Sequence, residues 1–178
     1  MEAALQDAAT TYLSLHAPEA FKSIEPLRGV YEKQSPFSAQ LLTSSYPQPL
    51  LFLDGEKGAV IAFYVLGQEL AGHPNILHGG GSAALLDELM GRIAVERLPS
   101  RKVSVTVSID FKYKGPVFLS HEMDGESRHW AVVAICAEVK DVTRRVAKVE
   151  GWIADFGTGE KLVECQGVFV EPREAGSV

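Results

Sequence analysis

The sequence is poor in cysteine, in basic runs and in long apolar segments. Its two cysteines, Cys136 and Cys165, are too few for a disulfide framework or a common zinc site, so we expect buried thiols and no bound metal. The 17 Lys and Arg residues are outnumbered by 23 Asp and Glu residues, and the longest basic runs have two residues, as at Arg144–Arg145. A chain of net charge −6 lacks the concentrated positive surface that nucleic acids and anionic membranes require, so we expect neither as a partner.

The apolar runs are also too short to cross a membrane. The longest, at 59–66 and 131–137, fall well below the roughly 20 residues that span a bilayer as a helix, so no stable membrane insertion is expected. The N-terminus carries Glu2 and Asp7 and no basic residue before Lys22, which fits neither a secretory signal nor an Arg-rich transit peptide. We therefore expect a cytoplasmic protein, or one of the mitochondrial matrix if a targeting segment is missing.

The length and composition predict one globular domain. With 178 residues, 46% of them hydrophobic, the chain is long enough to bury a core without disulfides. Helical spacing of apolar residues predicts a short helix at 2–16 and a long helix at 79–97. Apolar runs and period-two alternation predict strands at 59–66, 103–113, 130–141, 145–156 and 160–170.

The order of the elements predicts an α+β fold. A strand, one long helix and four further strands suit an antiparallel sheet of five or six strands that wraps the helix. Such a sheet leaves an exposed edge, so we expect homodimers or dimers of dimers. Five prolines between residues 18 and 56 favour irregular structure, a short helix and an edge strand there. We therefore divide the chain into an N-terminal extension (1–56), a main domain (57–171) and a C-terminal tail (172–178).

The strand expected at 103–113 alternates between apolar and polar residues. The alternation predicts one apolar face toward the core and one polar face toward solvent, with Thr106 on the polar face. The apolar set is Val103, Val105, Val107, Ile109, Phe111 and Tyr113, and the polar set is Ser104, Thr106, Ser108, Asp110 and Lys112.

The residues with chemical potential gather on the long helix. Its entrance consists of Gly79, Gly80 and Gly81, directly after His78. Glycines allow another molecule to approach the backbone, and the unpaired N–H groups at the positive end of a helix suit an anion or a developing oxyanion. Two turns further along, Asp87 is the ionisable residue of a stripe that is otherwise Gly or Ala. A solvated aspartate and a plain tight turn are the alternatives, but a stripe of small residues favours close contact with another group.

The segment from His78 to Glu88, followed by a strand that leads into Phe111–Pro116, resembles the hotdog-fold acyl-CoA thioesterases. The similarity is greatest to the phenylacetate-pathway type and to related thioesterase-superfamily proteins, and it covers about residues 57–170. The resemblance implies a long helix wrapped by an antiparallel sheet, paired sheets in a dimer, and active sites across the dimer interface. It also implies hydrolysis of an acyl-CoA in fatty acid metabolism, with CoA as part of the substrate and no separate cofactor.

The resemblance further implies roles for individual residues. Asp87 matches the catalytic carboxylate, which attacks the thioester or activates water. Gly80 matches the glycine whose N–H polarises the thioester carbonyl, and His78 matches the motif histidine. Thr106 matches a threonine that assists the carboxylate, and Asn75 stands where several members keep a polar group near the thioester.

Further substrate contacts are expected around these residues. Gly79 and Gly81 flank the proposed donor, and Gly81 replaces a larger residue common in the family, which alters the shape of the acyl pocket. The phosphates of CoA call for cations near the pocket mouth, and Lys112 and Lys114 are candidates.

Two other functions stay open within the same fold. An enoyl-CoA hydratase-like enzyme also uses a hotdog helix, although its usual Asp/His dyad spacing is not seen around Asp87. A CoA-ester-binding module without catalysis is the other alternative, but a binder needs no ionised carboxylate beside a thioester. A lipase-like α/β-hydrolase is excluded, because the chain has no Gly-x-Ser-x-Gly nucleophile elbow.

Overall fold

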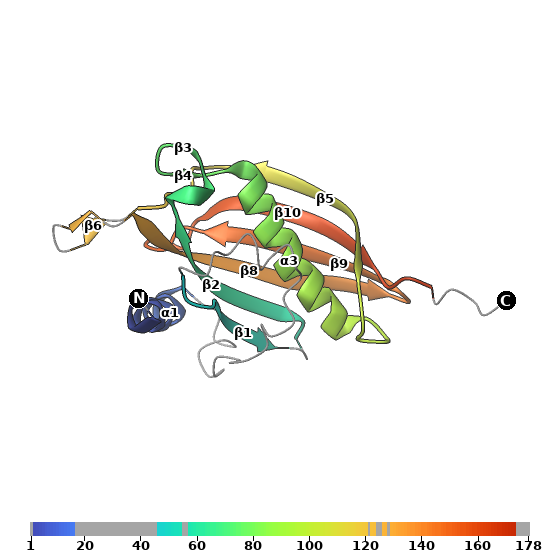
Figure 1. Cartoon of the computed structure of the whole chain (residues 1–178). Coiled ribbons are helices and arrows are strands. Elements are labelled where there is room, and N and C mark those ends of the chain that lie inside the picture. The colour runs from blue at the N-terminus through green and yellow to red at the C-terminus, as the bar shows by residue number, and fades with distance from the viewer. Residues whose placement is uncertain are drawn as a thin grey trace.

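The computed structural model shows a curved sheet around one long helix (Figure 1). It describes residues 2–16, 46–54, 57–120, 122–123, 126–127 and 129–173, so most of the Pro-rich segment and the end of the tail lie outside the described residues. The elements are α1 (Glu2–Leu15), β1 (Leu50–Asp54), β2 (Ala59–Gly67), the 3-10 helix η3 (Gln68–Leu70), β3 (Ala71–His73), β4 (Ile76–Leu77), α3 (Gly79–Arg97), β5 (Val105–Tyr113), β6 (Glu122–Met123), β7 (Glu126–Ser127), β8 (Trp130–Thr143), β9 (Val146–Ala154) and β10 (Lys161–Val170).

The main sheet has six strands in the order β1-β2-β8-β9-β10-β5, and every neighbouring pair is antiparallel. The predicted meander at the C-terminal end of the chain is confirmed as β8, β9 and β10. The edge strand expected within the Pro-rich segment is β1. Strand β5 follows α3 in the chain but pairs with β10, so it forms the opposite edge of the sheet. The predicted α+β fold is thereby confirmed, and the sheet has the larger of the two expected strand numbers, six.

The core lies between α3 and one face of the sheet. The mainly apolar face of α3, on which the prediction of a helix at 79–97 rested, is buried throughout. It is distinct from the stripe of small residues that carries Asp87. Strand β2 is buried along its whole length, as a continuous apolar run predicts. This core anchors the helix that carries the candidate site. The buried face of α3 consists of Ser82, Leu86, Leu89, Met90 and Ile93.

Two glycines on neighbouring strands seat α3 on the sheet. A Cβ at Gly151 would lie 2.7 Å from Met90 Sδ, and a Cβ at Gly167 would lie 2.8 Å from Met90 Cε. A side chain at either position would therefore force the end of the Met90 side chain to move away from β9 or β10. The glycine pair thus makes room for the Met90 side chain, one turn after Asp87 on α3.

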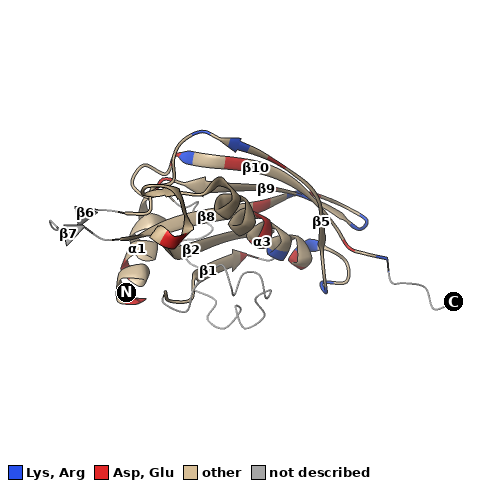
Figure 2. Ribbon diagram, turned by 45° about the horizontal axis from the view of Figure 1, so that its top comes forward, with Lys and Arg blue, Asp and Glu red and all other residues tan. Residues whose placement is uncertain are grey.

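Helix α1 covers the other face of the sheet, over β1, β2 and β8. Its buried residues are Leu5, Ala9, Tyr12 and Leu13, and the Tyr12 ring meets Phe63 edge-on at a centroid distance of 5.5 Å. The predicted amphipathic helix at 2–16 is thus a packing element. Strand β10, which lies away from α1, carries both acidic and basic residues (Figure 2). No helix in the described ranges is both long and apolar enough to cross a bilayer.

Candidate active site

The entrance of α3 is capped by the side chain that precedes it. His78 is extended (φ −60°, ψ 135°), and its carbonyl oxygen accepts a hydrogen bond from the Ser82 N–H at 3.0 Å. Its Nδ1 accepts a second bond from the Gly80 N–H at 2.9 Å. Because Nδ1 is the acceptor, a neutral ring carries its hydrogen on Nε2. The structure therefore gives His78 the position of an N-cap.

The cap occupies one of the three glycine N–H groups. Within the described part of the chain, no hydrogen bond takes up the N–H of Gly79 or of Gly81. Gly81 is buried, and a Cβ there would lie 3.2 Å from a methyl group of Leu77. Gly79 is half-buried. The Gly80 N–H, which the resemblance assigned to the thioester, is bonded to His78. The N–H of Gly79 is unpaired among the described residues, and Gly79 is more exposed than the buried Gly81.

Tyr113 closes the same end of the helix from β5. Its hydroxyl donates to the Gly79 carbonyl oxygen at 3.0 Å, and a Cβ at Gly79 would lie 3.6 Å from its ring. The ring stacks on Phe111 with centroids 6.1 Å apart and stays exposed. Sequence reasoning missed Tyr113 because alternation placed it among the core-facing residues of the strand.

Asp87 and Thr106 meet between α3 and β5. Thr106 Oγ1 donates a hydrogen bond to Asp87 Oδ1 at 2.7 Å, so the structure brings together the two residues that the sequence paired. Asp87 is half-buried, and no described residue is bonded to its other carboxylate oxygen. The arrangement holds one oxygen in place and leaves the second available to a water molecule or a substrate.

A β-bulge turns Thr106 toward the helix. Val168 on β10 pairs with Ser108, but the next residue, Phe169, pairs with Thr106, so Val107 is an extra residue on β5. Phe169 is fully buried in the core, and its partner Thr106 therefore lies on the side of α3. The predicted regular alternation of this strand was wrong, because the bulge exchanges the two faces at Val107.

The start of β5 also meets the stripe of small residues on α3. Ser104 Oγ donates to the Gly91 carbonyl oxygen at 3.0 Å, and a Cβ at Gly91 would lie 3.4 Å from the Phe169 ring. The small residues of α3 were expected to allow close contact with another group. At Gly91 that contact is made by Ser104, just before β5, and by Phe169 of β10 in the same chain. Beyond this contact, Val105 and Val107 are 51% and 63% exposed and leave an apolar strip on the edge strand.

Asn75 lies in the turn between β3 and β4, three residues before the His78 cap. Its φ of 63° is left-handed, a conformation that asparagine tolerates better than most residues. Its side chain and its backbone N–H are both bonded to Gln68, at 3.1 and 3.3 Å. The structure thus places Asn75 in the hairpin that leads into α3 and adds Gln68, which sequence reasoning did not select.

Two uncharacterised fungal proteins are similar to this chain in sequence. No protein-family model matches the chain. An uncharacterised mitochondrial protein of Candida albicans is 29% identical over 131 residues, which cover 70% of this chain and 53% of that protein. This chain thus spans about half the length of that relative. An uncharacterised protein of Schizosaccharomyces pombe is 28% identical over 167 residues, or 90% of this chain and 87% of its own.

Solved structures decide the fold. The PaaI protein of the Escherichia coli phenylacetic acid degradation operon superposes with a TM-score of 0.61 at 12% identity, over 80% of this chain and 88% of its own. The chain has the hotdog fold. A Streptococcus mutans protein bound to acetyl CoA has a TM-score of 0.55 at 14% identity, over 70% and 88% of the two chains. A hypothetical thioesterase of Streptococcus pneumoniae, solved with an Asp-to-Ala and with a Thr-to-Ala substitution, has a TM-score of 0.51 at 16% identity, over 64% and 82%.

The two halves of the candidate site lie far apart along the hotdog helix. Eight residues separate Gly79 from Asp87, which at about 1.5 Å per residue is a rise of about 12 Å. One thioester carbonyl is too small to contact the N–H of Gly79 and the carboxylate of Asp87 in the same chain. A site that used both groups would need the helix entrance of a second copy of the chain near Asp87.

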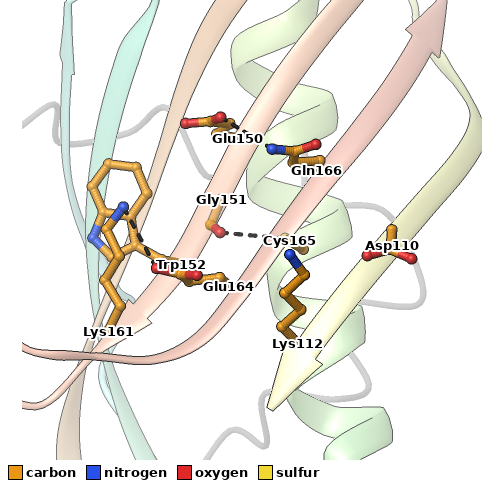
Figure 3. Close-up of a pocket in the computed structure, with 9 residues that line it drawn as sticks. All are labelled: Asp110, Lys112, Glu150, Gly151, Trp152, Lys161, Glu164, Cys165 and Gln166. Carbon is orange, nitrogen blue, oxygen red and sulfur yellow. Dashed lines mark hydrogen bonds and ion pairs between the residues drawn. The ribbon is translucent and has the colours of Figure 1, made fainter. Parts of the chain in front are cut away.

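The two lysines expected to bind CoA phosphates lie on the hotdog sheet face that points away from α3. Lys114 forms an ion pair of 2.7 Å with Glu164, and Lys112 lines a hollow with Glu164, Trp152 and Lys161 (Figure 3). The pKa of Glu164 is lowered mainly by its hydrogen bond to Lys114. The structure does not bring either lysine to the helix entrance, because each follows the outward side of β5 and β10.

The two cysteines belong to the apolar packing on the two sides of the sheet. Both thiols are buried, and burial raises the pKa of Cys165 to about 12 and also raises that of Cys136. Among the described residues, no group of three or more His, Cys, Asp and Glu side chains is arranged to hold a metal ion.

The capping role of His78 leads to a first prediction. His78→Ala is expected to lower the free energy of unfolding by about 1 kcal/mol, because the Gly80 N–H loses its acceptor. His78→Asn should restore most of the loss, since its amide oxygen can accept the same bond. Urea denaturation measures both, with the exposed His73→Ala as the matched control. An asparagine variant as unstable as the alanine variant would contradict the cap.

Proposed function

We propose that this protein hydrolyses the thioester of an acyl-CoA to a free acid and CoA. The observation that carries the proposal is the 2.7 Å hydrogen bond from Thr106 to Asp87 on the central helix of a hotdog fold. It orients one half-buried carboxylate on a stripe of small residues, where a substrate can approach its second oxygen. The reaction needs the ionised form of this carboxylate, which can serve as a nucleophile or as a general base.

The reaction balances with this one carboxylate. As a general base, Asp87 accepts a proton from water while the water oxygen bonds to the thioester carbon and the carbonyl electrons move to its oxygen. The tetrahedral intermediate then collapses, the C–S bond breaks, and the sulfur leaves as CoA thiol after taking up the proton. As a nucleophile, Asp87 would first bond to the carbonyl carbon; the C–S bond then breaks, and the thiolate leaves and takes up a proton to give CoA thiol. Water then attacks the resulting anhydride, which releases the free acid and restores the Asp87 carboxylate.

The helix entrance supplies the complementary half of the site. The N–H of Gly79, at the positive end of α3, suits the oxygen that becomes negative during attack, and one such donor typically contributes about 3–4 kcal/mol. Because this N–H is about 12 Å from Asp87 in the same helix, we assign the two halves of each site to two copies of the chain. The exposed edge strand β5, with Val105 and Val107 uncovered, is the surface for pairing.

Other hotdog proteins support the class of substrate. One structural neighbour binds acetyl CoA, and another was solved with an aspartate and with a threonine replaced. We propose a CoA ester as the substrate, a homodimer or a dimer of dimers as the active species, and no separate cofactor. A cytoplasmic location or, as for the Candida albicans relative, a mitochondrial one is compatible with this activity.

Thiol release from a panel of acyl-CoAs tests the proposal. The free thiol of CoA reacts with a chromogenic disulfide, so hydrolysis is read directly, and we expect turnover with at least one short, long or aryl acyl chain. Saturable binding without thiol release would support the binding module instead. Hydration of an enoyl-CoA without thiol release would support the hydratase-like enzyme.

A further inference from the structure

Both polar atoms of the Gln68 side chain form hydrogen bonds, with Asn75 and with the nearby backbone of Leu119. Its Nε2 donates to Asn75 Oδ1 at 3.1 Å and to the Leu119 carbonyl oxygen at 3.2 Å. Its Oε1 accepts from the Asn75 backbone N–H at 3.3 Å. All three groups are partly buried, so each bond replaces a bond to water that is no longer available.

The backbone groups decide which way both amides face. A peptide N–H can only donate and a peptide carbonyl can only accept, so Gln68 must place its oxygen toward Asn75 N and its nitrogen toward Leu119 O. The remaining hydrogen of that nitrogen then requires an acceptor at Asn75, which is Oδ1. The Nδ2 group of Asn75 is consequently directed away from Gln68, and no described residue accepts its hydrogens.

The turn itself is held in place as well. Leu119 N–H donates to the Asn75 carbonyl oxygen at 3.0 Å, and the Leu77 N–H donates to Val117 at 2.9 Å. The hairpin of β3 and β4 lies beside the entrance of α3 (Figure 1). An amide with one end fixed and the other end free, directly before the helix entrance, is a preorganised hydrogen-bond donor.

We infer that Gln68 is a positioning residue, which sets the side-chain amide of Asn75 so that Nδ2 donates to the thioester oxygen. This inference rests on the proposed hydrolysis of acyl-CoA. The donor strengthens its bond as the oxygen becomes negative, so it acts on kcat more than on KM. Gln68 itself does not touch the substrate.

Two isosteric substitutions test separately the proposed donor, Asn75, and the residue that orients it, Gln68. Asn75→Asp keeps an oxygen for Gln68 but removes the Nδ2 hydrogens, and kcat should fall by about tenfold with KM nearly unchanged. Gln68→Glu places a carboxylate against Asn75 Oδ1 and Leu119 O, which favours rotation of the Asn75 amide and brings Nδ2 to the new carboxylate. The expected loss in kcat equals that of Asn75→Asp. The double variant should lose no more than either single variant.

The controls separate positioning from general damage. Gln6→Glu makes the same chemical change on α1, on the other side of the sheet, and should leave kcat, KM and melting temperature unchanged. Side-chain amide signals of Asn75 in ¹⁵N spectra, assigned by their absence in Asn75→Asp, should shift in Gln68→Glu but not in Gln6→Glu. A wild-type kcat for Gln68→Glu, or losses that multiply in the double variant, would overturn the inference.

The spectra also keep this inference distinct from the proposed function. If the wild-type protein hydrolyses no acyl-CoA, the proposed function fails and the amide signals alone decide about Gln68. Shifted Asn75 signals in Gln68→Glu then support the positioning of the amide, and unchanged signals overturn it.

Discussion

Asp87→Asn is expected to lower kcat/KM for acyl-CoA hydrolysis by a factor of about 100 or more, with an unchanged melting temperature. The substitution is isosteric, and the new amide oxygen can still accept the hydrogen bond from Thr106, which is 2.7 Å long in the native protein. What disappears is the basic and nucleophilic oxygen. Because the residue is only half-buried, the fold gains or loses little from the change in charge.

Two companion variants make this result specific to Asp87. Glu88→Gln removes a carboxylate one residue further along the same helix and should leave turnover unchanged. Thr106→Val removes the donor to Asp87 and should reduce turnover, whereas Thr106→Ser keeps a hydroxyl and should retain most of it. Comparable kcat/KM in Asp87→Asn and in the parent protein would exclude Asp87 as the catalytic carboxylate.

The main elements of the fold were predictable because their patterns are long and local. Helix α3 carries its buried stripe over 19 residues, and β2 is an uninterrupted apolar run of a kind that only a covered strand tolerates. The order of the last three strands followed from short turns between them. Each of these patterns depends only on residues that are close together in the chain, so one sequence is enough to recognise it.

The bulge on β5 was not predictable because it depends on a distant strand. Nothing in the alternation around Val107 marks an extra residue, since Val107 has the apolar character that a regular strand requires. The register is set by β10, where Phe169 enters the core beneath α3 and takes Thr106 as its partner. The packing of Phe169 therefore decides that the Thr106 side chain faces α3, and the alternation of residues along β5 does not.

The cap at the helix entrance was missed for a different reason. Histidine is not among the residues that usually cap helices, so His78 was interpreted through its resemblance to a motif and not through its ring nitrogen. Once Nδ1 is seen to accept the Gly80 N–H, the oxyanion donor moves from Gly80 to Gly79 in our proposal. Gln68 and Tyr113 could not be selected from the sequence either. Each forms a hydrogen bond to a residue far away in the chain, Gln68 to Leu119 and Tyr113 to Gly79.

A mixture of two inactive variants is expected to regain activity if each site is shared between two copies of the chain. Asp87→Asn damages the carboxylate half, and Gly79→Val places a branched side chain over the N–H of the helix entrance. A Cβ at Gly79 meets only ordinary contacts with Tyr113, at 3.6 Å, so this variant should fold. Each variant alone should have lost most of its turnover.

Random pairing of these two variants in equal amounts makes half of the dimers mixed, and each mixed dimer contains one site with both halves intact. Co-refolded protein should therefore recover about a quarter of the wild-type activity. The matched control mixes Asp87→Asn with Thr106→Val, which damage the same half of the site because Thr106 bonds Asp87 within one chain. That mixture should recover no activity beyond the average of its two components. Activity in the first mixture no higher than the average of its components would show that carboxylate and helix entrance do not cooperate between copies, and the proposed two-chain site would fail.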